Sequence, residues 1–175
     1  EEIRWLFRIA GKIGLRMGEA RKLKFEDFDF ERRTVYLGKT KMKNNESRQI
    51  PYFFLPEIEM YCKGRSGYIM GTIPHRKTIE KWIQKLGIIL DLPAWTMPQS
   101  ESNEKTKAHI FRKSLGKDML YGTPGIANKP FPITMIAAQL GHSKKDNTPN
   151  VNMTMKYLRV TDQALRQAWE DDVND

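Results

Sequence analysis

The segment Thr154-Met155-Lys156-Tyr157-Leu158-Arg159-Val160 places a tyrosine late in a strongly basic chain. Four motifs precede this tyrosine in the chain. From the nearest to the most distant, they are Leu140-Gly141-His142-Ser143, His109-Ile110-Phe111-Arg112, a lysine-rich stretch from Lys39 to Arg48, and Gly14-Leu15-Arg16-Met17-Gly18-Glu19. No single one of these motifs is specific. The specific feature is their order along the chain: arginine, lysine, histidine, arginine, histidine and then tyrosine. Each of these residues also falls on a plausible structural element.

Length and charge set the broad class of the protein. The chain has 175 residues, of which 39% are hydrophobic, and this is enough to bury the core of one domain. The formal net charge is +9, and five acids against one base from Asp162 onward leave about +13 on residues 1–160. Such a charge favours a polyanionic partner such as nucleic acid, with an anionic membrane surface as the weaker option.

The single cysteine, Cys62, excludes an internal disulfide and indicates a reducing intracellular compartment. The sequence shows no apolar run near the ~20 residues of a membrane span and no signal peptide. Because the chain begins at Glu1 without methionine and already inside a helical pattern, we expect it to be a domain excised from a longer protein.

Hydrophobic periodicity predicts a mainly helical chain with one antiparallel hairpin. The expected hairpin pairs Arg33–Leu37 with Arg48–Phe54, placing Ile50, Tyr52 and Phe54 on one face, around a Lys-Met-Lys-Asn-Asn turn. The expected helices are Glu1–Ile13 (ended by Gly14), Arg16–Leu23, Leu55–Lys63, one marked by Ile79 to Leu90, His109–Tyr121, Ile133–Leu140, a short one around Tyr157 and one from Asp162 to about Trp169, with loops at Leu92–Thr106 and Lys144–Asn150.

In this order the motifs resemble the catalytic domain of the tyrosine recombinases, the phage-type integrase family, from about Arg4 to Val160. The resemblance implies the mainly helical α+β fold, with a small antiparallel sheet, that these enzymes share with type IB topoisomerases. It implies site-specific cleavage and rejoining of double-stranded DNA through a 3′-phosphotyrosyl link, without metal, nucleotide or other cofactor. A homotetramer on DNA, with a monomer as an option in the absence of DNA, is also implied. So are an intracellular protein of prokaryotic, phage or mobile-element origin and further DNA-binding domains outside this chain.

The resemblance assigns the nucleophile to Tyr157. A phenol has a pKa near ~10, so it needs nearby cations or a base before it attacks at neutral pH. Arg16 and Arg112 are the expected phosphate clamp, because a guanidinium presents paired donors to two oxygens and stays protonated. Glu19, one turn after Arg16, can pair with it and hold its rotamer. Solvated helix arginines are the ordinary alternative for both clamp residues.

The two motif histidines are expected to complete the site. His109 and Arg112 lie three residues apart and project from the same face of a helix. His109 would orient or deprotonate the phenol, and His142, just past a helix ended by Gly141, would donate to a nonbridging oxygen. A structural histidine is the alternative interpretation of each. With three histidines and no cysteine pair, the chain lacks the ligands for a zinc site.

The general acid for the leaving oxygen is expected among the hairpin lysines. Lys39, Lys41 and Lys43 compete, and Lys43 stands eight residues before Pro51, the interval that the family commonly uses. Neighbouring cations can depress a lysine pKa toward neutrality, which suits the role.

Two features lie outside the common pattern. His142 and Tyr157 are fifteen residues apart, a longer interval than is usual, and Lys144–Asn150 is the evident insertion, which could lengthen the tether of Tyr157. Residues 161–175 are acidic, and we expect a helix there that is packed in its own domain or exchanged between protomers. Two functional alternatives stay open: a type IB topoisomerase, and a noncatalytic DNA-binding protein that has no need of Tyr157.

Overall fold

The computed structural model describes residues 1–39, 45–91, 109–144 and 146–158, with only the backbone described for residues 39, 45, 46 and 157. The chain divides into two compact units, Glu1–Leu115 and Gly116–Asp175. Helix α6 (His109–Tyr121) begins in the first unit and continues into the second. In the described part of the chain, no helix is both long enough and apolar enough to cross a membrane.

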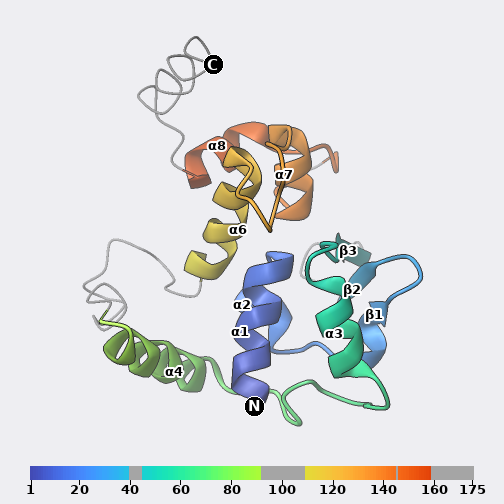
Figure 1. The fold of residues 1–175 in the computed structure, drawn as a ribbon, viewed down its shortest axis with the longest axis vertical. Coiled ribbons are helices and arrows are strands. Elements are labelled where there is room, and N and C mark those ends of the chain that lie inside the picture. Colours follow the sequence, from blue (N-terminus) through green and yellow to red (C-terminus); the bar gives the residue numbers. More distant parts are fainter. Residues whose placement is uncertain (40–44, 92–108, 145, 159–175) are drawn as a thin grey trace. The chain divides into compact units, whose positions relative to one another are not determined.

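The first unit combines helices with a small sheet (Figure 1). Its elements are α1 (Glu2–Ile13), α2 (Met17–Ala20), the 3₁₀ turn η1 (Phe25–Asp27), β1 (Phe28–Asp29), β2 (Thr34–Lys39), β3 (Asn45–Gln49), α3 (Leu55–Cys62), α4 (Arg76–Ile89) and the start of α6. Together with the helices of the second unit, they confirm the predicted mainly helical α+β fold with a small antiparallel sheet.

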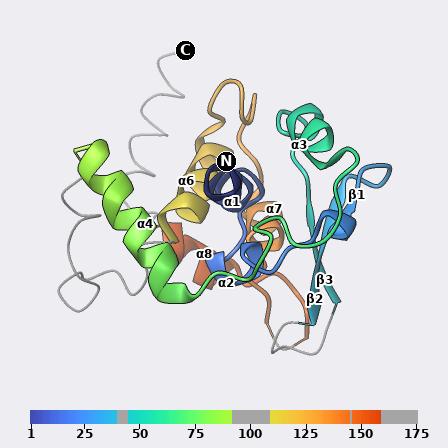
Figure 2. The same ribbon diagram turned by 90° about the horizontal axis from the view of Figure 1, so that it is seen from below.

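Helix α1 forms the centre of the first unit. Leu6, Ile9, Ala10 and Ile13 recur at three- and four-residue steps, and all four are buried. The helix lies between α4 and α3 in both ribbon views (Figures 1 and 2). Residues 2–13 therefore match the prediction, and the hydrophobic core of the unit is built on the buried face of this helix.

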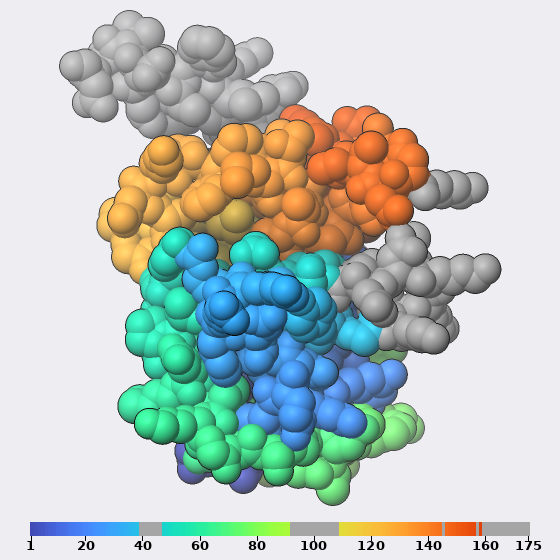
Figure 3. Space-filling model, turned by 90° about the vertical axis from the view of Figure 1, so that its right-hand side faces the viewer, coloured from blue at the N-terminus to red at the C-terminus, as the bar shows by residue number. Residues whose placement is uncertain are grey.

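The sheet has the strand order β1-β2-β3, and both pairs are antiparallel. Tyr36 pairs with Ser47, and the register then shifts before Lys39 pairs with Asn45. Gly38 lies at this irregularity with a φ of 63°, a left-handed conformation that favours glycine. Helix α3 lies beside the sheet in the ribbon view (Figure 1). In the space-filling view, the blue and green parts of the chain adjoin at the surface (Figure 3).

The prediction for the second hairpin strand was wrong in its bounds. The strand ends at Gln49, and a turn starts at Pro51. The Pro51 carbonyl accepts hydrogen bonds from the backbone N–H groups of Phe54 and Leu55. Ile50 and Phe54 are buried, whereas Tyr52 is 73% exposed. The Arg33 guanidinium lies over the Tyr52 ring. The expected common face is therefore absent, because proline cannot donate to a strand ladder and redirects the chain toward α3.

Helix α4 confirms the periodic pattern from Ile79 onward, although its apolar residues differ in burial. Ile79 and Ile83 are 2% and 1% exposed, whereas Ile89 at the end of the helix is 77% exposed. The predicted loop Leu92–Thr106 that follows lies outside the described residues.

The second unit contains the rest of α6 with α7 (Ile133–Gln139) and α8 (Val151–Leu158). Ile136, Leu140 and Leu158 form its buried cluster, flanked by partly buried side chains of α6 and of the connection to α7. The predicted helices at 109–121, at 133–140 and around Tyr157 are confirmed. The helix expected from Asp162 to Trp169 lies outside the described residues.

Gly116 lets α6 approach the other two helices of this unit. A β-carbon at this position would lie 2.7 Å from Leu158 Cδ2 and 3.1 Å from Leu140 Cδ1, and both leucines are buried. Gly18 in α2 is the opposite case, because nothing lies within 4 Å of the position that a β-carbon would take there.

We predict that Gly116→Ala lowers the free energy of unfolding, because an overpacking cost of about 1–3 kcal/mol exceeds the ~1 kcal/mol that alanine gains in helix propensity. Gly18→Ala is the matched control and should be neutral or stabilising. Urea unfolding of both variants measures the difference. Equal or greater stability of Gly116→Ala would show that the two leucines can move aside.

Candidate active site

The first motif forms a tight turn between α1 and α2. Gly14 ends α1 with a φ of 80°, and the N–H groups of Gly14 and Leu15 both donate to the Ala10 carbonyl, at 3.1 and 3.0 Å. Leu15 is fully buried and anchors the turn. The chain then enters α2 with Arg16 at the N-cap, so the predicted helix break before this arginine is confirmed.

Glu19 holds Arg16 through both of its carboxylate oxygens. Oε2 accepts the Arg16 backbone N–H at 2.7 Å, and Oε1 accepts from Arg16 Nη1 at 2.7 Å. The carboxylate is 8% exposed, whereas the Arg16 side chain is 38% exposed. The predicted pair is thus present, and it caps α2 while presenting a guanidinium at the surface.

Arg112 reaches the same turn from α6. Its Nη1 donates to the Gly14 carbonyl at 3.0 Å and lies 3.9 Å from Glu19 Oε2. The residue is 1% exposed, so it is not the solvated helix arginine that was the alternative interpretation. Two guanidiniums separated by 96 positions in the sequence therefore share one buried carboxylate.

The aromatic contact between α1 and α6 explains how Arg112 is placed. Phe111 stacks on Phe7 with ring centroids 5.0 Å apart and an interplanar angle of 17°. Gly11 of α1 lies against the same Phe111 side chain, since a β-carbon added at Gly11 would be 3.7 Å from Phe111 Cβ. His109, the first residue of α6, is partly buried and lies one turn before Arg112 on this helix.

In the second unit, His142 lies three residues past the end of α7. Gly141 adopts a φ of 55°, and the His142 N–H donates to the Ala137 carbonyl at 2.8 Å, so the predicted position of this histidine is confirmed. His142 is 3% exposed, and its Nδ1 lies 2.9 Å from Thr154 Oγ1 on α8. Tyr157 lies one turn further along α8, and its side chain is outside the described part.

The inserted loop after His142 is closed at its base. Ser143 and Pro149 form a β-bridge, and the Asn150 N–H donates to the His142 carbonyl at 2.6 Å. At the exposed tip, hydrogen bonds from the Thr148 hydroxyl and backbone N–H hold the pKa of Asp146 below its usual value. The described residues at the base of the insertion are therefore bonded to each other, and the effect of the insertion on the tether of Tyr157 stays a prediction.

The predicted site residues thus form two described groups. Arg16 and Arg112 meet around Glu19 in the first unit, and His142 is bonded to the helix of Tyr157 in the second. Lys39 ends β2 with an undescribed side chain, and Lys41 and Lys43 lie outside the described residues.

Two groups that bind the predicted site residues were not identified from the sequence. The Gly14 carbonyl, which binds Arg112, carries no side-chain signal. Thr154 does carry one: it precedes Leu158 by four residues and is a polar residue on the buried face of a helix.

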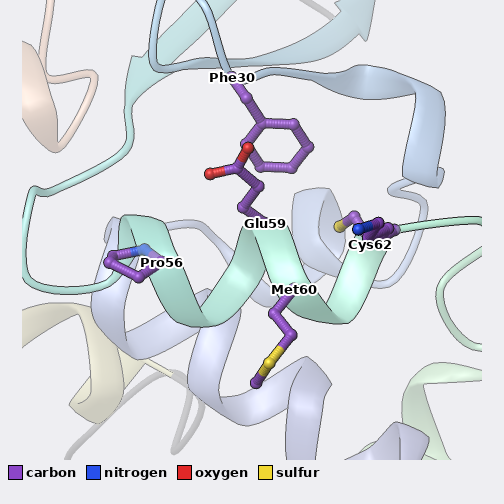
Figure 4. Close-up of a pocket in the computed structure, with 6 residues that line it drawn as sticks. Phe30, Pro56, Glu59, Met60 and Cys62 are labelled. Carbon is purple, nitrogen blue, oxygen red and sulfur yellow. The ribbon is translucent and has the colours of Figure 1, made fainter.

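A pocket of ≈ 570 Å³ lies on α3, away from these motif residues in the sequence (Figure 4). Its lining consists of Phe30, Pro56, Glu59, Met60, Cys62 and Lys63. Burial raises the pKa of the Cys62 thiol to about 12, so this sulfur is protonated and weakly nucleophilic at neutral pH. Across the described ranges, no group of three or more His, Cys, Asp or Glu side chains is arranged to hold a metal ion.

Comparison with known proteins agrees with the expected family resemblance and fold. Residues 1–62 match the model of the phage integrase family. The fold is similar to the crystal structure of XerA recombinase, with a TM-score of 0.63, 18% sequence identity and 98% of this chain covered. This chain covers 61% of the length of that one, and no curated protein matches it. The resemblance to the tyrosine recombinases is thereby confirmed.

We predict that Glu19→Gln lowers the free energy of unfolding by about 1–3 kcal/mol, the scale of lost hydrogen bonds to a charged group. The amide keeps the shape of the side chain but removes the negative charge between two arginines, and only one of its polar atoms can accept. Glu59→Gln on the exposed face of α3 is the control and should stay within ~0.5 kcal/mol of wild type. Indistinguishable unfolding curves for the two variants would contradict the structural role of Glu19.

Proposed function

We propose that this chain is the catalytic domain of a site-specific tyrosine recombinase that cleaves and rejoins double-stranded DNA. The observation that carries the proposal is the buried Glu19 carboxylate with Arg16 and Arg112 on its two oxygens. One arginine is enough to neutralise a carboxylate. Two guanidiniums around one carboxylate leave a net positive charge fixed in position, which suits a bound phosphate.

The geometry of this cluster supports a division of labour between the two arginines. Arg16 is tethered by its backbone and by Nη1, and its side chain is 38% exposed, so it is accessible to a phosphate. Arg112 is buried and bonded to the α1–α2 turn, which holds that turn in place behind Arg16. Preorganised charge of this kind costs no rearrangement when the pentavalent phosphate forms.

In the proposed reaction, the Tyr157 oxygen attacks the phosphorus and the bond from phosphorus to the 5′ oxygen breaks. The product is a 3′-phosphotyrosyl link, whose reversal rejoins the strand. His109 orients or deprotonates the phenol, and His142 binds a nonbridging oxygen. The leaving 5′ oxygen takes a proton from Lys43, with Lys39 and Lys41 as the competing donors.

The partners follow from charge and family. The formal net charge of +9 suits duplex DNA, bound with strong salt dependence. We propose a homotetramer on paired DNA sites, with the acidic segment from residue 161 onward passed to a neighbour. We also propose an intracellular protein of prokaryotic, phage or mobile-element origin that acts without metal or cofactor.

We predict that Tyr157→Phe abolishes the covalent adduct with a nicked suicide DNA substrate while DNA affinity stays nearly unchanged, because the change removes a nucleophile and no charge. Tyr121→Phe, at an exposed position of α6, is the control and should keep full adduct formation. Denaturing gel electrophoresis detects the adduct. An adduct that survives in Tyr157→Phe and is lost in Tyr121→Phe would move the nucleophile to α6.

The clamp is tested on the same substrate. Arg16→Ala should lower the single-turnover cleavage rate by about two orders of magnitude, the scale of one lost electrostatic donor. Arg112→Ala should do the same, with its folding checked by circular dichroism because this residue is buried. Cleavage at nearly the wild-type rate in a folded variant would remove that arginine from the clamp.

We predict that Lys43→Ala is rescued by a DNA substrate with a 5′-bridging phosphorothioate, because a sulfur leaving group departs without a proton. Arg16→Ala should not be rescued, since its loss affects the charge on the phosphate. Cleavage rates on the oxygen and sulfur substrates give the comparison. Selective rescue of Lys39→Ala or Lys41→Ala would assign the general acid to that lysine instead.

A further inference from the structure

Thr154 is a fully buried hydroxyl at the junction of two hydrogen bonds in the second unit. Its Oγ1 donates to the Asn150 carbonyl at 3.0 Å, one turn earlier along the chain. The same oxygen lies 2.9 Å from Nδ1 of His142, which is itself 3% exposed. The sequence motifs assign no role to this threonine.

A hydroxyl group has one hydrogen, and this fixes the direction of the second bond. When that hydrogen points at the Asn150 carbonyl, the oxygen can only accept from His142. Nδ1 must then carry a proton. The opposite arrangement, with an unprotonated Nδ1, would turn the hydroxyl toward the ring and leave one of the two short contacts without a hydrogen.

We propose that Thr154 is a positioning residue that keeps a proton on Nδ1 of His142. In the neutral ring Nε2 is then unprotonated and acts as an acceptor. His142 donates from Nε2 to a phosphate oxygen only after it takes up a second proton. This inference rests on the proposed recombinase function and makes the role of His142 more specific.

The same contact ties His142 to the helix of the proposed nucleophile. Thr154 and Tyr157 are one turn apart on α8, and the backbone bond from Asn150 to the His142 carbonyl lies at the start of that helix. Two hydrogen bonds therefore link the histidine to α8. A displacement of α8 that keeps both bonds must carry His142 with it.

The chain contains an internal reference for the opposite tautomer. Nδ1 of His75 accepts the backbone N–H of Lys77 at 3.3 Å at the start of α4, so the proton of its neutral ring is on Nε2. Nitrogen-15 NMR distinguishes the two tautomers in the full chain labelled at histidine. With three histidines in the sequence, His142→Gln assigns the signals of interest.

We expect the neutral His142 ring of the wild-type chain to carry its proton on Nδ1, and His75 to carry it on Nε2. Thr154→Val keeps the shape of the side chain without the hydroxyl and should shift the His142 proton to Nε2. Thr154→Ser restores a hydroxyl and should restore the wild-type tautomer. A wild-type His142 protonated on Nε2, or a Thr154→Val spectrum identical to wild type, would overturn the proposal.

Cleavage of the suicide substrate provides the second measurement. Thr154→Val removes the acceptor that orients the ring and bonds Nδ1–H of the doubly protonated, donating form of His142. It should therefore lower the rate by about tenfold, the scale of one hydrogen bond, and Thr154→Ser should recover it. A tautomer shift without any loss of cleavage would overturn the positioning role. If wild type itself forms no adduct, the proposed function fails, while the NMR result still decides the tautomer.

Discussion

The Glu19 carboxylate between two guanidiniums is the constraint around which the first unit is organised. A carboxylate with 8% exposure is costly unless it is paired, and Arg16 and Arg112 supply that pairing. The need to pair this carboxylate constrains the α1–α2 turn, because Glu19 also caps α2. It constrains α6 as well, because Arg112 on that helix pairs with Glu19 and donates to the Gly14 carbonyl. The hydrophobic core then supports this arrangement through the stack of Phe7 on Phe111.

The second unit also pairs buried polar groups, here an imidazole and a hydroxyl. His142 and Thr154 are both buried polar side chains, and each satisfies the other between the end of α7 and α8. Close packing around Gly116 places Leu158, the neighbour of Tyr157, in one buried cluster with Leu140, the C-cap residue of α7. Packing and hydrogen bonding thus constrain the same short helix from two sides.

Much of this arrangement could be predicted from the sequence, and the exceptions have physical causes. The α1 and α6 helices were predictable because their apolar residues recur with helical spacing or their ends carry strong motifs. The strand Asn45–Gln49 was misplaced because it has no apolar alternation and is held by backbone pairing with β2. The pairing of Arg112 with Gly14 could not be predicted, since a contact to a main-chain carbonyl 98 residues away leaves no trace in residue identity.

The closed loop after His142 also bears on how such proteins are recognised. Ser143 pairs with Pro149, so the residues between them add length along the chain without adding distance in space. The number of residues between two motifs measures their separation along the chain. Catalysis depends instead on the distance in space between the residues that the motifs contribute. Divergent relatives could therefore differ widely in this interval and keep the same geometry, and a search that penalises gaps at this point would overlook them.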